Sequence, residues 1–456
     1  MKPLIIIHGW SDQASSFISL AEAIEKKTNR TIEQLWLGNY ISLDNDVQME
    51  DLVRGLDLAW RDRKLPIKSK SVDVIVHSTG GLIIRDWIYS NFVSKGLKPP
   101  VNNLVMLAPA NFGSPLAHKG RAFYGRVLKG FNSNKRFETG SQILKALEMA
   151  SPYSWDLAQK DCFKKSAFTP NGVRTTVIVG NRGYRGISSL ANKDGSDGTV
   201  YVSSANLSCE YLTIDFPSLP RKPKARKIKS SKGTTAFLIA DDHDHSSVAL
   251  KDPDHEGNTV LINAITKALG ISNAKNFNAW VKSCAIKTRA VMAKYSDEVD
   301  TYKHGFQNTV FRVRDDQGFD VDDYVVEFYQ DADKGFLDIF AELFNRSAVT
   351  DVHAYKGNGA YRSFMINCTE LYRIVDQEGE QLRISLSAMP DINDEKNVVG
   401  YRTFEDGDMH YLELNAAEIK KFFMPNRTLF VDITLTREQK KGLFTLQTVD
   451  ELNPNG

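Results

Sequence analysis

Residues 72–88, VDVIVHSTGGLIIRDWI, decide the fold of this chain. The first five form a mostly apolar run that predicts a buried strand, and the residues from Gly80 onward have the apolar spacing of a helix. Ser78 lies in the short gap between them, after His77 and before two glycines. A turn this sharp strains the serine backbone and lifts the hydroxyl above the sheet, where it is exposed for nucleophilic attack. The alternative is a simple helix N-cap, a position that serine also favours.

Strand and helix patterns alternate over about the first 270 residues. The strand candidates are Pro3–Ile7, Ile32–Leu37, Val72–Val76, Asn103–Leu107, Thr175–Val179 and Thr234–Ala240, and the helix candidates are Ser15–Lys27, Met49–Lys64 and Gly80–Val93. Such alternation predicts an α/β fold with a mostly parallel sheet and helices on both faces. In such sheets, functional sites form at the carboxyl ends of the strands.

Further segments complete the predicted organisation. The segment at about 112–170 mixes glycine, serine, proline and aromatic residues and is too long for a plain connection, so we expect a cap or lid inserted in an α/β domain over 1–271. A helical connector over 272–303 follows, because residues 276–299 have helical spacing. Short alternating stretches, among them Leu371–Val375, then predict a mainly β domain over 304–456, arranged as an antiparallel β-sandwich.

The composition excludes several classes of protein. Of the 456 residues, 42% are apolar and 25% are charged, as in ordinary globular proteins, and the net charge of +2 gives no reason to expect nucleic-acid binding. The four cysteines are widely scattered, which predicts buried free thiols rather than a disulfide framework or a zinc site. We expect neither a metal nor a cofactor.

The sequence also carries expectations about location. No run approaches the roughly 18 apolar residues that span a bilayer. The start, MKPLIIIHGW, has a short apolar run and no small-residue cleavage site, so it predicts a first strand rather than a signal peptide. We therefore expect a cytoplasmic protein, with export by a route that needs no N-terminal signal left open.

Five stretches together carry a family resemblance over roughly residues 1–270. They are IIIHGW (5–10), VHSTGGLIIR (76–85), LVMLAPANFGSP (104–115), DGTVYVSSA (197–205) and DHSSV (244–248). With them the chain resembles the α/β-hydrolase serine lipases and esterases, in the broad group that includes the PGAP1-like hydrolases. Val76 departs from that pattern, because it stands where the usual G-x-S-x-G motif has its first glycine.

The resemblance implies a catalytic triad in the order serine, acid, histidine. It makes Ser78 the nucleophile, Asp197 the acid and His245 the base. Asp194 is the competing acid and His243 the competing base, since each lies close to the preferred residue in the sequence. Two histidines two positions apart among aspartates also fit a metal site, although only weakly.

The resemblance further implies an oxyanion hole made by two backbone amides. The N–H of Trp10, which follows the first histidine–glycine pair, is one donor, and the N–H of Thr79, next to the nucleophile, is the other. His8 and His77 are expected to hydrogen-bond to backbone near the serine turn rather than to act as bases.

These residues predict a serine-dependent carboxylic ester hydrolase, a lipase or phospholipase acting on lipid acyl esters. The aromatic residues of the cap favour an acyl pocket, or else they form the cap's own core. The basic segment Arg221–Lys232 predicts a solvated loop near the site or one strand-length away, and a peripheral contact with anionic membranes. A catalytically inactive binding or scaffold protein, and a thioesterase or amidase with the same triad, are the alternatives. No sequence feature identifies a partner for the C-terminal domain.

Overall fold

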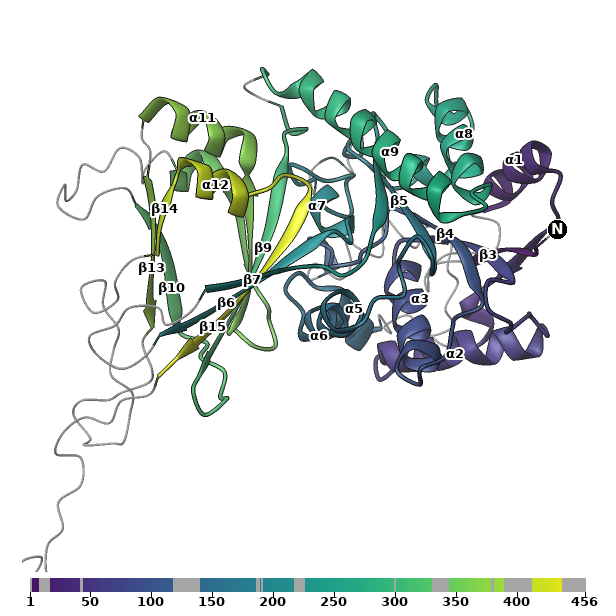
Figure 1. Cartoon of the computed structure of the whole chain (residues 1–456), viewed down its shortest axis with the longest axis horizontal. Helices are drawn as coiled ribbons and strands as arrows, with labels where there is room; N and C mark the ends of the chain where they lie inside the picture. The colour runs from purple at the N-terminus through teal and green to yellow at the C-terminus, as the bar shows by residue number, and fades with distance from the viewer. Residues whose placement is uncertain are drawn as a thin grey trace, which may run out of the picture.

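Six parallel strands form the first sheet of the protein (Figure 1). The computed structural model describes residues 2–7, 17–41, 44–117, 140–185, 189, 192–216, 226–298, 301–329, 344–378, 381–388 and 412–436. In the order in which they pair, the strands are β2 (Ile32–Leu35), β1 (Leu4–Ile7), β3 (Val72–His77), β4 (Val101–Leu107), β5 (Arg174–Gly180) and β8 (Thr235–Ala240). This is the predicted α/β sheet, and its parallel strands bring their carboxyl ends to one edge.

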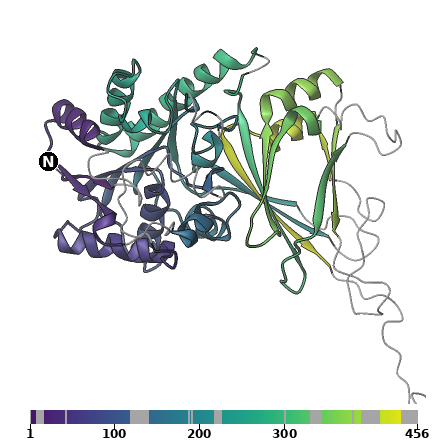
Figure 2. The same cartoon turned by 180° about the vertical axis from the view of Figure 1, so that it is seen from behind.

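Helices cover both faces of this sheet (Figures 1 and 2). One face carries α1 (Ile18–Thr28), α8 (Asn258–Leu269) and α9 (Ala274–Tyr295), and the other carries α2 (Met49–Asp62) and α3 (Gly80–Ile88). A capping box between Gln48 and Asp51 starts α2, whose apolar residues then recur at helical spacing. Every residue of α3 is buried, which explains its almost wholly apolar sequence.

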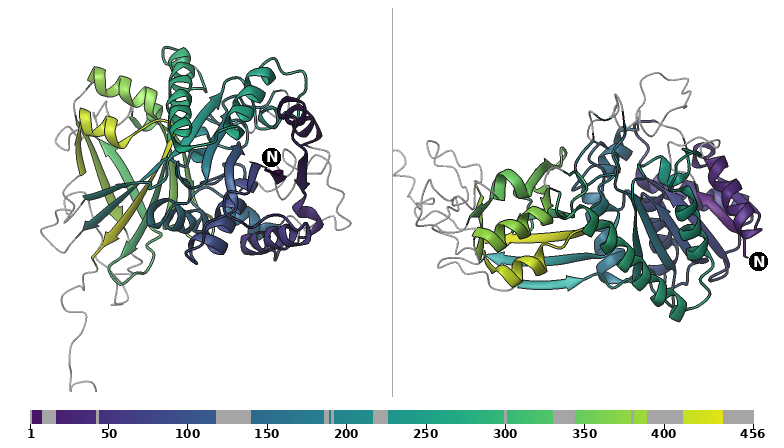
Figure 3. Two further views of the ribbon diagram at one scale, coloured as in Figure 1. Left: turned by 45° about the vertical axis from the view of Figure 1, so that its right-hand side comes forward. Right: turned by 90° about the horizontal axis from the view of Figure 1, so that it is seen from above.

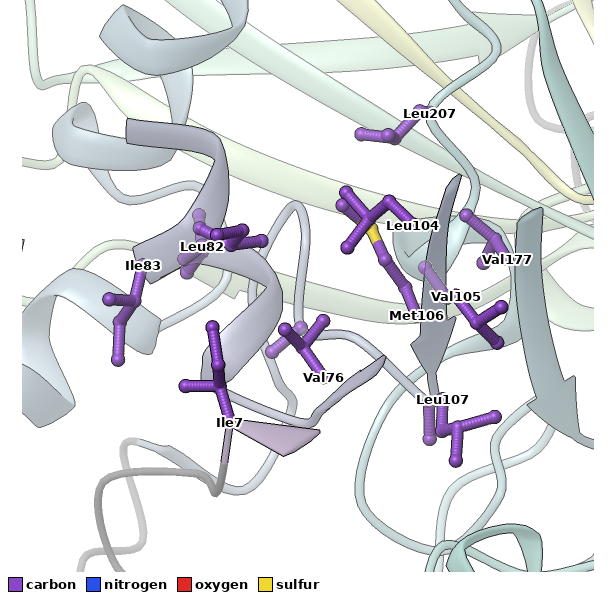
Figure 4. Packing of buried hydrophobic residues seen from close by; sticks show 14 of the residues in the cluster. Ile7, Val76, Leu82, Ile83, Leu104, Val105, Met106, Leu107, Val177 and Leu207 are labelled. Carbon is purple, nitrogen blue, oxygen red and sulfur yellow. The ribbon is translucent and has the colours of Figure 1, made fainter. Parts of the chain in front are cut away.

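The contact between α3 and the sheet supports the turn at Ser78. Figure 4 shows Ile7 and Val76, at the carboxyl ends of β1 and β3, beside Leu82 and Ile83 of α3. None of these four side chains is accessible to solvent. The close packing of apolar side chains fixes the start of α3 against the strand ends.

A second sheet of six strands lies beside the first (Figure 3). In pairing order its strands are β11 (Val349–Ala354), β12 (Tyr361–Asn367), β9 (Phe306–Asp315), β15 (Arg427–Leu435), β6 (Cys209–Phe216) and β7 (Arg226–Ser230). A three-stranded antiparallel sheet contains β10 (Tyr324–Tyr329), β13 (Gln381–Ala388) and β14 (Leu412–Asn415). The second six-stranded sheet, the three-stranded sheet and the helices α11 (Cys368–Glu378) and α12 (Ala416–Phe422) share one hydrophobic core. The six-stranded sheet is mixed rather than purely antiparallel, because β15 runs parallel to β9 and β6.

Two strands of the second sheet come from the first 271 residues. β6 and β7 lie between β5 and β8 in the sequence, but they pair with each other and, through β6, with β15. The second sheet therefore contains chain from both sides of residue 271. β7 also changes the interpretation of the basic segment Arg221–Lys232, since residues 226–230 form an edge strand instead of a loop; residues 217–225 lie outside the described chain.

The stretch Leu371–Val375 is helical, and the prediction of a strand there was wrong. It lies within α11 (Cys368–Glu378). The side chain of Asn367 accepts hydrogen bonds from the N–H groups of Thr369 and Glu370, which starts a helix. The apolar residues Leu371, Ile374 and Val375 recur at intervals of three and one, which fits a helix face as well as a short strand. A second helix, α12 (Ala416–Phe422), packs in the same core.

The cap is described over residues 112–117 and 140–170, where it contains α5 (Ser141–Leu147), α6 (Pro152–Ala158) and the π-helical turn η5 (Gln159–Lys164). Trp155 packs edge-on against Phe430 of β15, with ring centroids 5.1 Å apart, and Phe112 does the same at 5.2 Å. These cap aromatics therefore hold the cap to the second sheet. The cap residues Phe123, Tyr124, Phe131 and Phe137, which were expected to help line an acyl pocket, lie outside the described residues.

A buried ion pair fastens the cap to α3. The guanidinium of Arg85 donates two hydrogen bonds to the carboxylate of Asp161, at 2.8 and 3.0 Å, and a third to the Asn111 carbonyl oxygen. The side chains of Arg85 and Asp161 are 0% and 3% exposed, so burial alone would lower the pKa of the guanidinium, but the carboxylate raises it overall. The buried guanidinium charge is tolerated because the Asp161 carboxylate and the Asn111 carbonyl oxygen replace its contacts with water.

Other sequence expectations have simpler outcomes. All four cysteines are buried and free, as predicted. Across the described part of the chain, no helix has the length and apolar character needed to cross a membrane.

Candidate active site

The turn after β3 holds Ser78 in the left-handed region, with φ of +53°. A non-glycine residue in that region is strained, and strain of this kind is typical of a nucleophile turn. Space requires glycine at position 81 and favours it at position 80. A Cβ on Gly80 would lie 3.3 Å from the Cβ of Val76, and one on Gly81 would lie 2.5 Å from the Cβ of Pro109. Val76 thus occupies the room that the usual first glycine leaves empty, and Gly80 accommodates it.

Three side chains from separate loops meet beside this turn. Nε2 of His245 lies 3.1 Å from Oγ of Ser78, and Nδ1 of His245 lies 2.9 Å from Oδ2 of Asp197. Ser78 follows β3, Asp197 follows β5 and His245 follows β8. The three loops leave the same carboxyl edge of the sheet, which is why residues so distant in sequence come together.

The Asp197 carboxylate is held by its own loop. Its Oδ1 accepts hydrogen bonds from the N–H groups of Thr199 and Val200, at 2.9 and 2.8 Å. Its backbone carbonyl accepts from the N–H of His245 at 2.9 Å. Oδ2 is left to face the imidazole, so the loop aims one carboxylate oxygen at His245.

The serine hydroxyl is buried, contrary to the expectation that the turn would expose it. Ser78 is 1% exposed, His245 2% and Asp197 0%. The physical reason lies in the neighbouring loops: the N–H of Ala110, from the loop after β4, donates to the carbonyl oxygen of Ser78, and the imidazole of His245 covers the hydroxyl.

The competing candidates lie away from this arrangement. Asp194 is exposed, three residues before the buried Asp197. His243 stacks on His255, with ring centroids 4.0 Å apart, and burial followed by repulsion from His255 lowers its pKa to about 4. Among the residues that the structure describes, no group of three or more histidine, cysteine, aspartate or glutamate side chains is arranged to hold a metal ion.

One of the two expected oxyanion donors can be located. The N–H of Thr79 begins the turn into α3 and has no hydrogen-bond acceptor among the described residues. Trp10, the other expected donor, and His8 lie outside the described residues. The start of α3 also favours negative charge at this point, because the helix dipole is positive there.

Sequence reasoning missed part of the surroundings of the site. Nε2–H of His77 donates to the carbonyl oxygen of His245 at 3.0 Å, and the two rings lie 4.6 Å apart. The hydroxyl of Tyr184 lies 3.3 Å from Oγ1 of Thr199 and 3.4 Å from Oγ of Ser246, so it bridges the acid and histidine loops. Backbone contact for His77 was expected, but nothing in the local sequence marks Tyr184.

Comparison with known proteins gives a clear result for the fold alone. No family model matches the sequence, and no curated protein matches it either. Phospholipase PlaB from Legionella pneumophila in complex with thio-NAD superposes with a TM-score of 0.79 at 22% identity, over 98% of this chain and 96% of that one. A second structure of PlaB gives 0.78 at 23% identity, with the same coverage. The lipase BlEst2 from Bacillus licheniformis gives 0.36 at 14% identity, over 59% of this chain and 91% of that one. The parallel sheet, the serine turn and the PlaB likeness together show that this chain has the α/β-hydrolase fold.

Proposed function

We propose that this protein is a serine-dependent carboxylic ester hydrolase. The observation that carries the proposal is the imidazole of His245, which lies within hydrogen-bond distance of both Oγ of Ser78 and Oδ2 of Asp197. A serine hydroxyl is a weak nucleophile until a neighbouring base takes its proton. The arrangement provides that base and a carboxylate to orient it.

The reaction follows from these contacts. Nε2 of His245 takes the proton of Ser78 while Oγ attacks the carbonyl carbon of the ester. The resulting imidazolium keeps its Nδ1–H directed at Asp197, and it then protonates the leaving alcohol. Water, deprotonated by the same imidazole, attacks the acyl-enzyme and releases the acid and the free serine.

Backbone amides stabilise the oxyanion in both steps. The N–H of Thr79 is positioned for this role by the turn, and Trp10 is proposed as the second donor. Losing one such donor typically costs about 3 kcal/mol of transition-state stabilisation. The burial of the triad strengthens this effect, because charges interact more strongly in a medium of low polarity.

Lipid acyl esters are the proposed substrate class, with phospholipids as the narrower choice. PlaB is a phospholipase, and the likeness extends over 98% of the present chain, including the second sheet. These points support a phospholipase but leave the acyl length and head group to measurement.

The decisive experiment is a substrate panel assayed with the wild type and the Ser78→Ala variant side by side. The panel contains p-nitrophenyl esters of increasing chain length, phospholipids, an acyl thioester and an amide. Wild-type hydrolysis that the variant lacks, with unchanged circular dichroism, supports the proposal. Equal hydrolysis by both proteins rejects it, and turnover of only the thioester or the amide moves the enzyme to those classes.

A catalytically inactive binding protein is the second candidate. The observation in its favour is the 1% exposure of Ser78. A fluorophosphonate probe separates the two candidates, because it labels an activated serine and leaves an inactive one unmodified. Labelling of the wild type that the Ser78→Ala variant loses rejects the inactive candidate.

We propose a peripheral contact with anionic membranes through the basic segment Arg221–Lys232. Lys229 and Lys232 are exposed, and Nζ of Lys232 donates to the Lys164 carbonyl oxygen. Since Lys232 lies three positions before the first residue of β8, Thr235, this part of the segment lies near the amino edge of the first sheet, opposite Ser78. Flotation with anionic vesicles tests the contact: binding that falls in high salt, and falls further when both lysines are changed to glutamine, supports it.

A further inference from the structure

We propose that Asp351, in the C-terminal half of the chain, is a positioning residue for the triad. It acts on the acid loop, defined here as Lys193–Tyr201, which contains Asp197. The inference rests on the proposed hydrolase function and assigns the second sheet a role in it. The two β11 residues that reach the first domain, Asp351 and His353, are two positions apart and so lie on one face of the strand.

Asp351 contacts both ends of the acid loop. Its Oδ1 lies 2.9 Å from Nζ of Lys193, and its Oδ2 accepts a hydrogen bond from the hydroxyl of Tyr201 at 2.8 Å. Tyr201 is 2% exposed, and burial followed by the charge of Asp351 raises the pKa of its phenol. One carboxylate thus bridges the residues where the loop begins and ends.

The middle of the loop touches the same half of the chain. The N–H of Gly195 donates to the Tyr302 carbonyl oxygen at 2.7 Å. Gly195 has φ of +71°, and a Cβ there would lie 2.3 Å from the ring of Phe306, the first residue of β9. Phe306 and Tyr201 belong to one small apolar cluster. The loop therefore packs directly on the start of the second sheet.

A second contact from β11 supports the opposite side of the acid loop. Nε2–H of His353 donates to the carboxylate of Glu148 at 2.7 Å, and Glu148 is 3% exposed. The adjacent Leu147 accepts a backbone hydrogen bond from Ser114, whose hydroxyl donates to the Thr199 carbonyl oxygen at 2.5 Å. The loop is thus held by the second sheet directly and through the cap.

These contacts matter for the reaction because the backbone of the acid loop itself orients the Asp197 carboxylate. Thr199 and Val200, inside the loop, supply the two N–H groups that orient the Asp197 carboxylate. A displacement of the loop ends shifts the carboxylate relative to His245, and a misplacement of about 1 Å can reduce a rate about 100-fold. Asp351 touches no reacting atom, so its effect is on kcat through Asp197.

The test compares Asp351→Asn with Asp376→Asn in the full chain. Asp376 serves as the control: it is another aspartate of the C-terminal half that pairs with a lysine, but it lies on α11 and its partner, Lys420 at 2.7 Å, is far from the acid loop in the sequence. We expect Asp351→Asn to lower kcat for a p-nitrophenyl ester 10- to 100-fold, at an unchanged KM, and to raise hydrogen exchange over 193–201. Asp376→Asn leaves both unchanged. Lys193→Gln reproduces the loss, and the double variant is no worse than the poorer single variant, because one contact cannot be lost twice.

The outcomes separate this inference from the proposed function. Unchanged kcat or unchanged exchange in Asp351→Asn overturns the inference while leaving an active enzyme. An equal loss in Asp376→Asn overturns it too, because the effect is then general destabilisation. If the wild type hydrolyses no ester, the proposed function fails, and hydrogen exchange alone decides whether Asp351 holds the loop. Tyr201→Phe provides an independent variant in case Asp351→Asn does not fold.

Discussion

The imidazole of His245 lies 3.1 Å from the hydroxyl of Ser78, although 167 positions separate the two residues in the sequence. Each residue follows the end of a strand in the same parallel sheet, and Asp197 follows a third. The order and direction of the strands therefore bring these side chains close together. This relationship yields predictions about the triad, the turn that carries the serine, and the surroundings of the histidine.

The first prediction distinguishes the two candidate acids. Asp197→Asn removes the charge that faces His245, so we expect kcat to fall by about 10,000-fold, as happens when the equivalent carboxylate of a serine protease is neutralised. Asp194→Asn, three positions away on an exposed residue, should leave kcat unchanged within about twofold. Ester hydrolysis by the two purified variants measures both. A large loss in Asp194→Asn with a small one in Asp197→Asn would exchange their roles.

The second prediction concerns the two glycines after Ser78. Gly81→Ala places a Cβ 2.5 Å from the Pro109 ring, which cannot move aside, and should destabilise the protein by about 1–3 kcal/mol. Gly80→Ala meets Val76 at 3.3 Å, so a small shift relieves it and the cost should be lower. Urea unfolding of the two variants gives the comparison. Equal midpoints for Gly81→Ala and the wild type would show that the turn has more room than the packing implies.

The third prediction concerns the buried ion pair between α3 and the cap. Asp161→Asn leaves the Arg85 guanidinium buried without its counter-charge, which should cost about 3–5 kcal/mol of unfolding free energy. The control is Arg54→Gln, whose pairing with Asp51 is exposed and should be worth less than about 1 kcal/mol. Chemical denaturation measures both changes. Similar stabilities for the two variants would mean that Arg85 finds another partner or water.

The fourth prediction is a pH dependence of stability from His243. Its pKa is lowered to about 4 in the folded protein, so the unfolded chain, with an ordinary histidine pKa near 6.5, binds the proton first as the pH falls. The folded state therefore loses stability between about pH 6.5 and pH 4. We expect the wild type to lose about 2 kcal/mol more than His243→Phe between pH 7.5 and pH 5, because the phenyl ring keeps the stack without titrating. Equal losses in urea unfolding would contradict this.

Parts of the fold and site that are encoded by residues close together in the sequence could be predicted. A strand, a serine and a helix within 17 residues specify the sharp turn at Ser78, and the family resemblance predicted which acid and histidine would lie near it. His245 does lie beside Ser78 and Asp197 beside His245, whereas His243 stacks on His255 and Asp194 is exposed. Their roles in catalysis stay predictions until the variants are measured.

Features that depend on distant pairing could not be predicted. The stretch around Leu371 has spacing that suits a strand and a helix equally, and only its contact with the surrounding core decides between them. No local pattern indicates that Asp351 reaches Lys193, 158 positions away, or that neighbouring loops bury Ser78. Such contacts depend on how separate elements assemble. The spacing of apolar residues within one segment does not predict them.

The parallel pairing of β6 with β15 constrains how the protein can be made. Tyr211 and Asp432 lie 221 positions apart and are joined by a hydrogen bond across this pairing. During synthesis β6 can pair with β7, but its other edge lacks β15 until residue 435 has emerged from the ribosome. A premature stop before Arg427 would leave the hydrogen-bonding edges of β6 and β9 open, and open edges of this kind recruit other chains. Late truncations should thus produce aggregation rather than a smaller working enzyme.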